Sequence, residues 1–313
     1  MLKLKFNKKT IRGSLARQLI KIGVKIESLD PKAKLNFGKL YTTKLSDNYK
    51  YPKYVSADWI TKEETKMELI RDIRSKARNL IIQFHGGAYV YGYNDMYRRS
   101  ALKLLALSKN TAVLSLDYRL APANPFPAAL NDAVCAFDYA LSQGFDPNRI
   151  ILMGDSAGGG LALALGLYLR DHNRQLPKAI ITMSAWTDLT ASGESYLRNR
   201  SLDPMLGEKI DTLDIKGYVG GDDVRNPYIS PVFGDFHGFC DLMMHVGSYE
   251  VLESDTLSVA KKAADQGVYV EATLYRGMFH VFQLAFNLIP EAKKAWKEIA
   301  DFINRQFRKE GVD

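Results

Sequence analysis

The sequence has few of the features that mark secreted, membrane-spanning or metal-binding proteins. It has only two cysteines, Cys135 and Cys240, and neither lies in a CxxC or metal-ligand spacing, so we expect two reduced thiols. No apolar run reaches the roughly 18 residues of a transmembrane helix. The basic start MLKLKFNKKT is not followed by an uninterrupted apolar segment and a cleavage site, so we expect no secretory signal. These absences predict a cytoplasmic protein.

Acidic residues are scarce at the start of the chain, and this accounts for the formal net charge of +8. Residues 1–53 contain 14 Lys and Arg but only 3 Asp and Glu. The rest of the chain contains 29 Lys and Arg and 32 Asp and Glu. Enzymes that act on nucleic acids have basic working surfaces. The near-neutral body therefore predicts no nucleic-acid partner, and the lack of a spanning run predicts no stable membrane insertion. The sequence leaves a homodimer open.

Apolar, β-rich runs alternate with helical patterns from about residue 79 onward. Runs that predict strands, several of them without polar alternation, cover 79–85, 111–118, 149–154, 178–186, 241–250 and 270–277. Helical patterns cover 94–109, 127–143, 156–171, 255–266 and 290–308. This order predicts an α/β fold with a mostly parallel central sheet and helices on both faces. Shorter candidate strands ahead of it, KLYTTKL, YPKYVSADWI and KMELIRDI, predict an antiparallel edge.

The stretch from 187 to 240 breaks this rhythm, because it is too long for a simple connection between strands. Long connections of this kind usually carry function or form a lid. We expect a small helical piece at about 202–219, lying over the carboxyl edge of the sheet.

Residues 154–160 read GDSAGGG between a predicted strand and a predicted helix. Each glycine in a helix costs about 1 kcal/mol relative to alanine, so this site must require the absence of side chains. Gly154, Ser156 and Gly158 form a G-x-S-x-G pattern, which at a sharp strand-to-helix turn presents a serine hydroxyl at a helix N-terminus. The two glycines that follow would let the helix press against neighbouring strands. The alternative is a glycine-rich turn with an incidental serine.

A second glycine-containing stretch, HGGAYVYG, follows the strand predicted at 79–85. Acyl transfer needs N–H donors aimed at the oxyanion that forms in its transition state. Gly86 and Gly87 expose N–H groups that no side chain obstructs, and Ala157 supplies a third, so we expect these residues to form an oxyanion hole. His85 ends the strand, and we interpret it as ordering the loop rather than as a base.

A serine nucleophile needs a base, and the base must be held by an acid. In one known arrangement the acid and then the histidine follow the serine along the chain. His172 lies in a polar helix end, His237 in a loop, and His245 inside a strand. His280 follows the last predicted strand at the carboxyl edge of the sheet, where an imidazole can reach Ser156. We therefore predict His280 as the base.

The acid is expected just past the strand at 241–250, in HVGSYEVLESDT. This stretch offers Glu250, Glu253 and Asp255. Glu250 comes first and precedes two apolar residues that would anchor the turn, so we predict it as the acid. Asp255 is typical of the first turn of a helix and remains the alternative.

Together these stretches resemble the hormone-sensitive-lipase-like branch of the α/β-hydrolases, the bacterial family IV carboxylesterases. The resemblance rests on HGGAYVYG, LDYRLAPANPFPAALND, GDSAGGG, SAWTDLTASGESYLRNRSLDPML, NPYISPVFGD and GMFHVFQL, between about residues 80 and 285. Two positions depart from the family pattern. Glu250 matches the usual aspartate acid of a D-P-L-like turn, and Ala123 replaces the glutamate of A-P-E-x-P-F-P.

The resemblance implies an α/β-hydrolase fold with a helical cap. The cap would comprise residues 1–50 and an insertion at about 187–225 within a catalytic domain of residues 51–313. The resemblance also implies hydrolysis of short- to medium-chain carboxylic esters through an acyl-enzyme, without metal or cofactor. The alternatives are an amidase or lactonase with the same catalytic residues, or a member of the fold that binds a small molecule without hydrolysing it.

The N-terminal segment IRGSLARQLIKIGVKIESL has apolar residues at three- and four-residue steps: Ile11, Leu15, Leu19, Ile22, Ile26 and Leu29. This spacing places them on one face of a helix, with four Lys and Arg largely on the other faces. Such a helix can lie on an anionic membrane, or its apolar face can pack on the protein as part of the cap. The resemblance favours the second arrangement, and we predict that the apolar face is buried.

Overall fold

The computed structural model describes residues 1–29 and 45–308. Within these ranges, nine strands form one sheet in the order β1-β9-β8-β7-β6-β4-β5-β3-β2. The strands are β1 Leu2–Asn7, β2 Val55–Lys62, β3 Thr65–Asp72, β4 Asn79–Phe84, β5 Thr111–Asp117, β6 Ile150–Asp155, β7 Ala179–Met183, β8 Asp241–Gly247 and β9 Val270–Tyr275. Neighbours from β1 to β5 in this order are parallel, and β3 is antiparallel to both β5 and β2.

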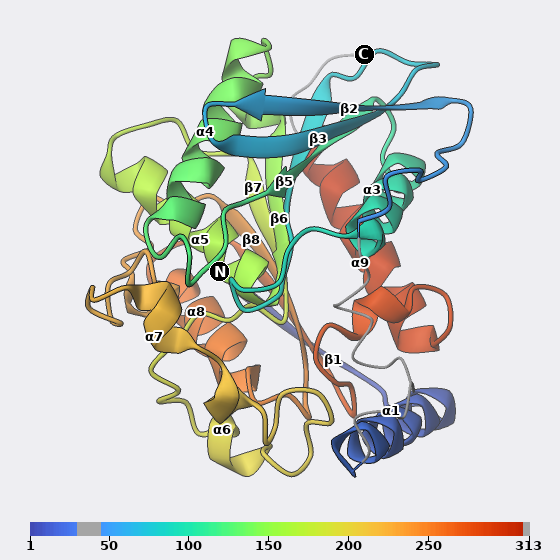
Figure 1. Cartoon of the computed structure of the whole chain (residues 1–313), viewed down its shortest axis with the longest axis vertical. Helices are drawn as coiled ribbons and strands as arrows, with labels where there is room; N and C mark the ends of the chain where they lie inside the picture. The colour runs from blue at the N-terminus through green and yellow to red at the C-terminus, as the bar shows by residue number, and fades with distance from the viewer. Residues whose placement is uncertain (30–44, 309–313) are drawn as a thin grey trace.

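Helices cover both faces of the sheet (Figure 1). They are α1 Ile11–Leu29, α3 Asp95–Leu107, α4 Ala128–Ser142, α5 Ser156–Asp171, α6 Ser195–Arg198, α7 Ile215–Val219, α8 Glu253–Asp265 and α9 Pro290–Arg308. The core under α4, α5 and α8 includes Leu80 and Ile82, whereas the core under α3 and α9 includes Ile81. This alternation follows from the strand geometry, because successive side chains point to opposite faces.

The α/β prediction is confirmed, with each predicted parallel strand and main helix present. β4, β6 and β7 are buried at every residue. Because helices cover both faces of these strands, polar residues have no solvent-facing side to occupy, which explains the continuous apolar runs. The carboxyl ends of the parallel strands meet at one edge of the sheet, and the loops that follow them carry the predicted site residues.

The outer strands on the two sides of the sheet differ in how well they were predicted. The antiparallel edge is confirmed by β2 and β3, whereas the candidate KLYTTKL lies almost wholly outside the described residues. The opposite edge is β1, which the sequence analysis did not predict. Its six residues pair in parallel with β9, and its side chains are mostly exposed. Exposed Leu and Lys residues in alternation gave too short a pattern to identify a strand.

The small helical piece predicted at about 202–219 is present only in its second half. The structure has the short α6, a 3₁₀ turn at Ile210–Thr212 and the short α7 in this insertion. Asp203 accepts hydrogen bonds from the N–H groups of Met205 and Leu206, which forms a side-chain-stabilised turn where the helix was predicted to begin. α7 ends at Gly220 in the left-handed region (φ 68°).

The prediction that the apolar face of α1 is buried is wrong. Gly13, Arg17 and Ile20 are buried, whereas the predicted apolar residues up to Ile22 are exposed. The side chains of the last two, Ile26 and Leu29, lie outside the described part of the chain. Gly13 lets the helix approach α9 closely, and the Arg17 guanidinium lies 4.7 Å from the centre of the Tyr249 ring. Within residues 1–29 and 45–308, no helix is long and apolar enough to span a membrane.

Candidate active site

The turn between β6 and α5 places Ser156 in the left-handed region, with a φ of 52°. A non-glycine residue in this conformation is strained and persists only where the surrounding structure enforces it. The enforcement is visible at the flanking glycines. A Cβ at Gly154 would collide with the carbonyl oxygen of Gly158, and a Cβ at Gly158 would collide with the carbonyl oxygen of Phe84. The predicted need for glycine on both sides of Ser156 is confirmed.

The next two glycines bring α5 against the strand end that follows β7. A Cβ at Gly159 would lie 2.8 Å from the Cβ of Ala185, and one at Gly160 would collide with the carbonyl oxygen of Trp186. The carbonyl oxygen of Ser156 also accepts a hydrogen bond from the Trp186 N–H at 2.9 Å. The glycine run therefore allows the serine, its helix and the neighbouring segment to pack backbone against backbone.

His280 lies between Ser156 and Glu250 and is hydrogen-bonded to both. Its Nε2 is 2.9 Å from Ser156 Oγ, and its Nδ1 is 2.9 Å from Glu250 Oε2. The side chains come from the turns that follow β6, β8 and β9, and all of them are buried. The fold thus brings together the predicted nucleophile, base and acid, which lie far apart in the sequence.

Glu250 is held through its second carboxylate oxygen. Oε1 accepts hydrogen bonds from Ser184 Oγ at 2.8 Å and from the Gly247 N–H. Ser184 Oγ in turn accepts a hydrogen bond from the Val281 N–H at 3.1 Å, next to His280. Ser184 therefore joins the two turns that carry the acid and the base. Ser184 was not predicted, because a serine just after a strand has no distinguishing pattern.

Asp255, the alternative acid, has a different role. Its Oδ2 accepts hydrogen bonds from the N–H groups of Thr187 and Asp188, both at 2.8 Å. It thus orders the start of the insertion and makes no hydrogen bond to His280. Burial raises the pKa of the Asp255 carboxyl to about 8. Of the two candidates, only Glu250 contacts the imidazole.

The loop after β4 requires a correction to the predicted oxyanion hole. The Gly86 N–H donates to the hydroxyl of Tyr97 at 2.8 Å, so this donor is already engaged. Gly87 and Ala88 follow in the same loop with φ values of 120° and 53°. The ring of His85 stacks on Tyr118 at 3.9 Å and its Nδ1 lies 2.8 Å from the Gly86 carbonyl oxygen. This geometry agrees with the interpretation of His85 as a loop-ordering residue.

Two further buried carboxyl groups act electrostatically on His280. Burial alone lowers the pKa of the imidazole, but the hydrogen bond and charge of Glu250, with the charges of Asp203 and Asp155, raise it more, so the pKa lies above 6.5. Burial raises the pKa of the Asp155 carboxyl to about 7, although the positive charge of protonated His280 acts to lower it. Asp155 Oδ2 also accepts a hydrogen bond from the Tyr97 hydroxyl at 3.3 Å.

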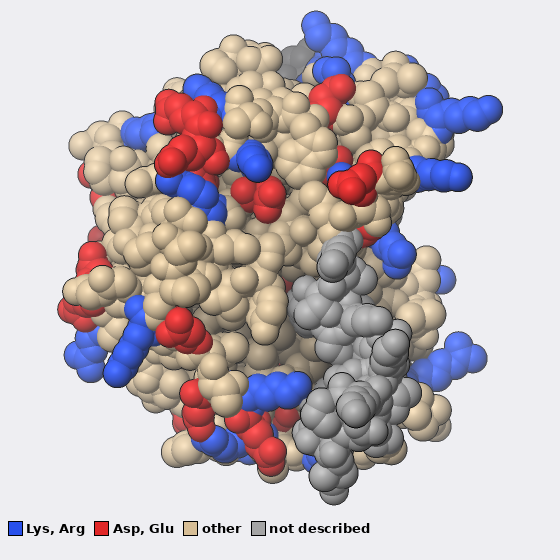
Figure 2. Space-filling view, viewed as in Figure 1, with Lys and Arg blue, Asp and Glu red and all other residues tan. Residues whose placement is uncertain are grey.

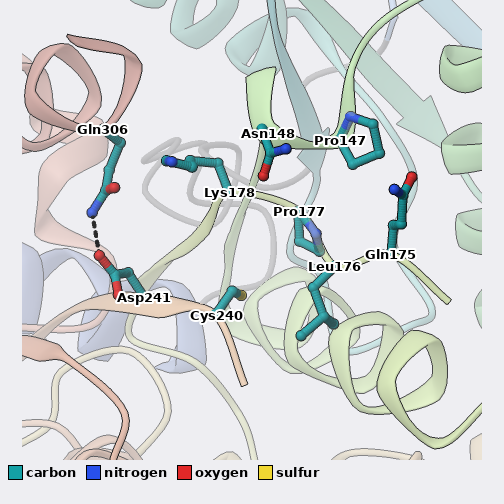
Figure 3. A pocket seen from close by; sticks show the side chains of 9 residues that line it. All are labelled: Pro147, Asn148, Gln175, Leu176, Pro177, Lys178, Cys240, Asp241 and Gln306. Atoms are coloured by element: carbon teal, nitrogen blue, oxygen red, sulfur yellow. Dashed lines mark hydrogen bonds between the residues drawn. The ribbon is translucent and has the colours of Figure 1, made fainter. Parts of the chain in front are cut away.

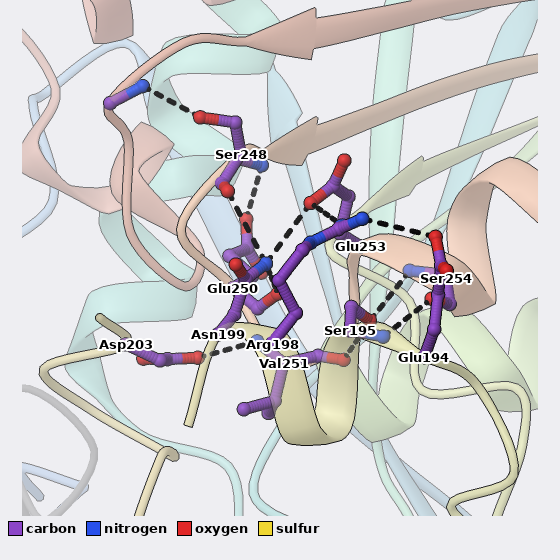
Figure 4. A network of polar contacts seen from close by, with 12 residues as sticks. Glu194, Ser195, Arg198, Asn199, Asp203, Ser248, Glu250, Val251, Glu253 and Ser254 are labelled. Atoms are coloured by element: carbon purple, nitrogen blue, oxygen red, sulfur yellow. Dashed lines mark hydrogen bonds and ion pairs between the residues drawn. The ribbon is translucent and has the colours of Figure 1, made fainter. Parts of the chain in front are cut away.

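The insertion is bound to the turn that carries Glu250 by a network of polar contacts (Figure 4). Asn199 Nδ2 donates to the carbonyl oxygen of Glu250 at 2.7 Å, and Asp203 Oδ2 accepts from the Val251 N–H at 3.0 Å. Ser195 Oγ donates to the carbonyl oxygen of Val251. These positioning contacts were not predicted, because nothing in the spacing of the insertion points to the acid turn.

An apolar cavity of about 230 Å³ opens beside His280. It lies between α1, the insertion and the segment after β9, and its lining comprises Ala16, Leu19, Ile20, Met205, Phe279, His280, Val281, Leu284, Ala285, Leu288 and Ile289. Met205 is part of the turn that Asp203 holds. The same carboxylate therefore fixes both the acid turn and one wall of this cavity.

A larger hollow, of about 390 Å³, lies at the amino ends of β7 and β8 (Figure 3), whereas Ser156 follows the carboxyl end of β6. Gln306 Nε2 donates across it to Asp241 Oδ2 at 2.7 Å. Burial raises the pKa of the Cys240 thiol, which keeps this group in its unreactive protonated form. None of the predicted site residues lines this hollow, so it is not part of the candidate active site.

The remaining histidines lie away from the serine, as predicted. His172 and His237 are exposed, and their Nδ1 atoms lie near the Tyr168 carbonyl oxygen and Asp235. His245 is buried in β8, with Nε2 3.4 Å from a carboxylate oxygen of Glu298. It is a partnered core histidine.

Known proteins share this architecture. Residues 81–284 match the family described as "alpha/beta hydrolase fold". The chain is 36% identical over 250 residues to an acetyl-hydrolase of Streptomyces hygroscopicus, which covers 79% of this chain and 82% of that protein.

Solved esterase structures are similar over nearly the whole chain. One, from the bacterial hormone-sensitive lipase family, has 30% identity and a TM-score of 0.81, and covers 96% of this chain and 99% of its own. Another, EstE5 soaked with p-nitrophenyl butyrate, has 30% identity and a TM-score of 0.82, and covers 95% of this chain and 99% of its own. The sequence matches, the shared fold and the arrangement of motifs lead to one conclusion: the chain belongs to the hormone-sensitive-lipase-like branch of the α/β-hydrolases, the bacterial family IV carboxylesterases.

Proposed function

We propose that this carboxylic ester hydrolase cleaves short- to medium-chain esters through an acyl-enzyme formed on Ser156. The observation that carries the proposal is the buried hydrogen-bonded line from Ser156 through His280 to Glu250, with 2.9 Å at each step. A serine hydroxyl becomes a nucleophile when a base accepts its proton and an acid orients the base.

In the proposed reaction, Ser156 Oγ attacks the ester carbonyl carbon while His280 Nε2 takes the hydroxyl proton. Glu250 orients the imidazole through Nδ1 and stabilises its charged form. The tetrahedral intermediate collapses to the acyl-enzyme, and His280 gives its proton to the departing alcohol. Water then attacks the acyl group by the same route, which releases the acid and restores the serine.

The oxyanion that forms in each half-reaction needs N–H donors in place beforehand. We propose that Gly87 and Ala157 supply two of them, as the sequence predicted. Ala88 takes the third place, because the Gly86 N–H is bound to Tyr97. Ala157 is at the N-terminus of α5, where the helix dipole also favours negative charge.

The size of the apolar cavity supports short- to medium-chain substrates. Its volume of about 230 Å³ is below the roughly 300–1,000 Å³ of sites for drug-sized ligands. The names of similar proteins, an acetyl-hydrolase and an esterase soaked with a butyrate ester, agree with small acyl groups. We propose that residues 1–50 and about 187–225 act as the cap over this cavity, since α1 and the insertion contribute Ile20 and Met205 to its wall.

A direct test compares p-nitrophenyl butyrate with the matching butyryl anilide, and treats the enzyme with phenylmethylsulfonyl fluoride. We expect ester cleavage far faster than anilide cleavage, and a sulfonyl adduct located on Ser156 by mass spectrometry. Faster anilide cleavage would identify an amidase, and absence of turnover on esters and lactones would identify a binding protein. An adduct on another residue would overturn the assignment of Ser156.

We further propose a cytoplasmic location, supported by the free thiols of Cys135 and Cys240. Fractionation of the native host tests this. The sequence leaves a homodimer open, and analytical ultracentrifugation of the purified chain measures the oligomeric state.

A further inference from the structure

α1 presents an apolar face to the surroundings rather than to the protein. We call the four residues of this face the apolar stripe. Their exposed fractions are 88% for Ile11, 59% for Leu15, 52% for Leu19 and 54% for Ile22. At about 100° per residue they fall within an arc of about 80° on the helix. The buried residues Gly13, Arg17 and Ile20 lie on the opposite side. The exposure of the apolar stripe therefore follows from how α1 docks.

The segment that carries the apolar stripe is strongly basic, and the acidic residue in α1 is Glu27, near the end of the helix. Residues 1–26 contain 8 Lys and Arg and no Asp or Glu, whereas residues 27–313 contain 35 of each kind. The formal net charge of the whole chain therefore lies in this segment. Lys8 and Arg12 are exposed beside the apolar stripe, and neither has an ion-pair partner among the described residues. Elsewhere, acidic and basic side chains are interspersed across the face seen in Figure 2.

The apolar stripe is also continuous with the cavity beside His280. Leu19 belongs to the stripe and also lines the cavity. Leu288, which is 83% exposed, lines the cavity as well. α1 lies at the periphery of the molecule in Figure 1, away from the antiparallel edge. A flat surface laid against the stripe would therefore meet the mouth of the cavity.

We propose that α1 docks the enzyme on an anionic lipid surface, with the apolar stripe inserted among the headgroups. Interfacial helices combine an apolar face with flanking Lys and Arg, and bind through buried apolar area and attraction to anionic lipids. A second copy of the chain fits less well as the occupant, because a symmetric interface would bring together two segments of the same strong positive charge. Anionic headgroups supply the opposite charge.

If the proposed function holds, this docking gives the cavity beside His280 direct access to esters dissolved in the bilayer. The binding itself does not depend on catalysis. It is therefore measured on the Ser156→Ala variant as well as on the wild type, so that failure of the docking and failure of the proposed function are distinguishable.

The experiment is co-sedimentation with vesicles of equal parts phosphatidylglycerol and phosphatidylcholine, compared with vesicles of phosphatidylcholine alone. The stripe variant carries Ile11→Gln, Leu15→Gln and Ile22→Gln, because glutamine preserves helix propensity and none of these residues lines the cavity. The control carries Ile73→Gln and Leu197→Gln, which are exposed by 62% and 81% but lie outside α1. A charge variant carries Lys8→Glu and Arg12→Glu.

We expect wild type, Ser156→Ala and control to bind anionic vesicles, with binding reduced by high salt and weak on phosphatidylcholine alone. The stripe and charge variants should each bind at least about tenfold more weakly, with unchanged circular dichroism. Equal binding by the stripe variant and wild type, or no binding by wild type, overturns the proposal. So does a wild-type dimer in ultracentrifugation that the stripe variant dissociates, since the occupant would then be a second copy.

Discussion

The turns after β6 and after β8 each deliver a side chain to His280, but they are held in different ways. Ser156 is fixed by main-chain packing, because Gly154 and Gly158 let strand and helix approach more closely than any side chain would permit. Glu250 is fixed by polar side chains of the insertion, with Asn199 and Asp203 bound to the backbone of its turn. The glycines lie within two positions of Ser156 in the sequence, whereas the hydrogen bonds that hold the second turn join residues 51 and 48 positions apart.

This difference indicates how each turn responds to substitution. Main-chain packing leaves the β6 turn only one conformation, so an added side chain acts on the whole fold. Hydrogen bonds hold the β8 turn from outside, so single bonds can be removed while the fold is retained. We therefore expect substitutions that disturb the first turn to change stability, and those that disturb the second to change rate and pH dependence.

Removing the reacting group from the β6 turn gives the largest expected effect. Ser156→Ala should lower kcat for p-nitrophenyl butyrate by at least about 10⁴-fold, since loss of a nucleophile costs on this order in other serine hydrolases. The Tm should stay close to wild type, because only a hydroxyl is lost and the glycine packing is untouched. Near-wild-type turnover by the purified variant would remove Ser156 from the proposed mechanism.

The acid at the β8 turn comes next. Glu250→Gln should lower kcat by about 10³- to 10⁴-fold, because an amide cannot accept from both the imidazole and the donors at Ser184 and Gly247. The matched control is Asp255→Asn, whose remaining oxygen can still accept from Thr187 and Asp188, and we expect less than about a tenfold loss. The reverse ranking in steady-state kinetics would transfer the role to Asp255.

A methyl group at the β6 turn tests the main-chain packing. Gly158→Ala should lower the free energy of unfolding by at least about 3 kcal/mol, because its Cβ meets carbonyl oxygens of Phe84 and His85 that cannot shift independently. Gly166→Ala in the same helix meets only side-chain atoms of Phe239 and Ile180, and should cost about 1 kcal/mol or less. Urea denaturation measures both, and equal costs would contradict this account.

Neutralising a carboxylate that holds the β8 turn gives the smallest effect. The charge of Asp203 helps to raise the pKa of His280, so Asp203→Asn should lower that pKa. Because the neutral imidazole is the base, activity falls as pH drops through this pKa, and the acid limb of the kcat/KM profile should move to lower pH. We expect kcat to fall only about tenfold, since one hydrogen bond to Val251 is lost.

Asp188→Asn is the control for this shift. Asp188 is a buried carboxylate of the same insertion, but it accepts hydrogen bonds from Thr190 and Ser192 and makes none to the acid turn. Its pH profile should match wild type. An identical shift in both variants would mean that the effect is not specific to Asp203.

The same comparison explains what the sequence could predict. The strands, the main helices and the turn at Ser156 depend on local apolar patterns and glycine positions, and these were predicted. His280 and Glu250 were found because they follow strands whose carboxyl ends share one edge. The contacts of Ser184, Asn199 and Asp203 depend on which loops meet in space, so no local pattern reveals them. The engaged Gly86 N–H depends on Tyr97, a helix residue outside the motif.

For α1 the apolar spacing predicted the helix correctly, but it predicted the wrong buried face. An apolar stripe indicates which side of a helix avoids water, but not whether the protein itself covers that side. Here the side of α1 that packs on the protein carries a glycine and an arginine. Gly13 permits close approach to α9, and the Arg17 guanidinium lies over the ring of Tyr249.

β1 sets the order in which this protein can finish folding on the ribosome. Met1 and Val268, 267 positions apart, already form a hydrogen bond at the start of the β1–β9 pairing. At about 5–20 residues per second, the N-terminal strand waits on the order of 10 to 50 s before its partner is synthesised. Until then its unpaired backbone groups, and the basic helix behind it, remain open to other chains, nascent-chain chaperones or a nearby bilayer. β1 is thus synthesised long before its partner β9 and is among the last strands to be incorporated into the sheet.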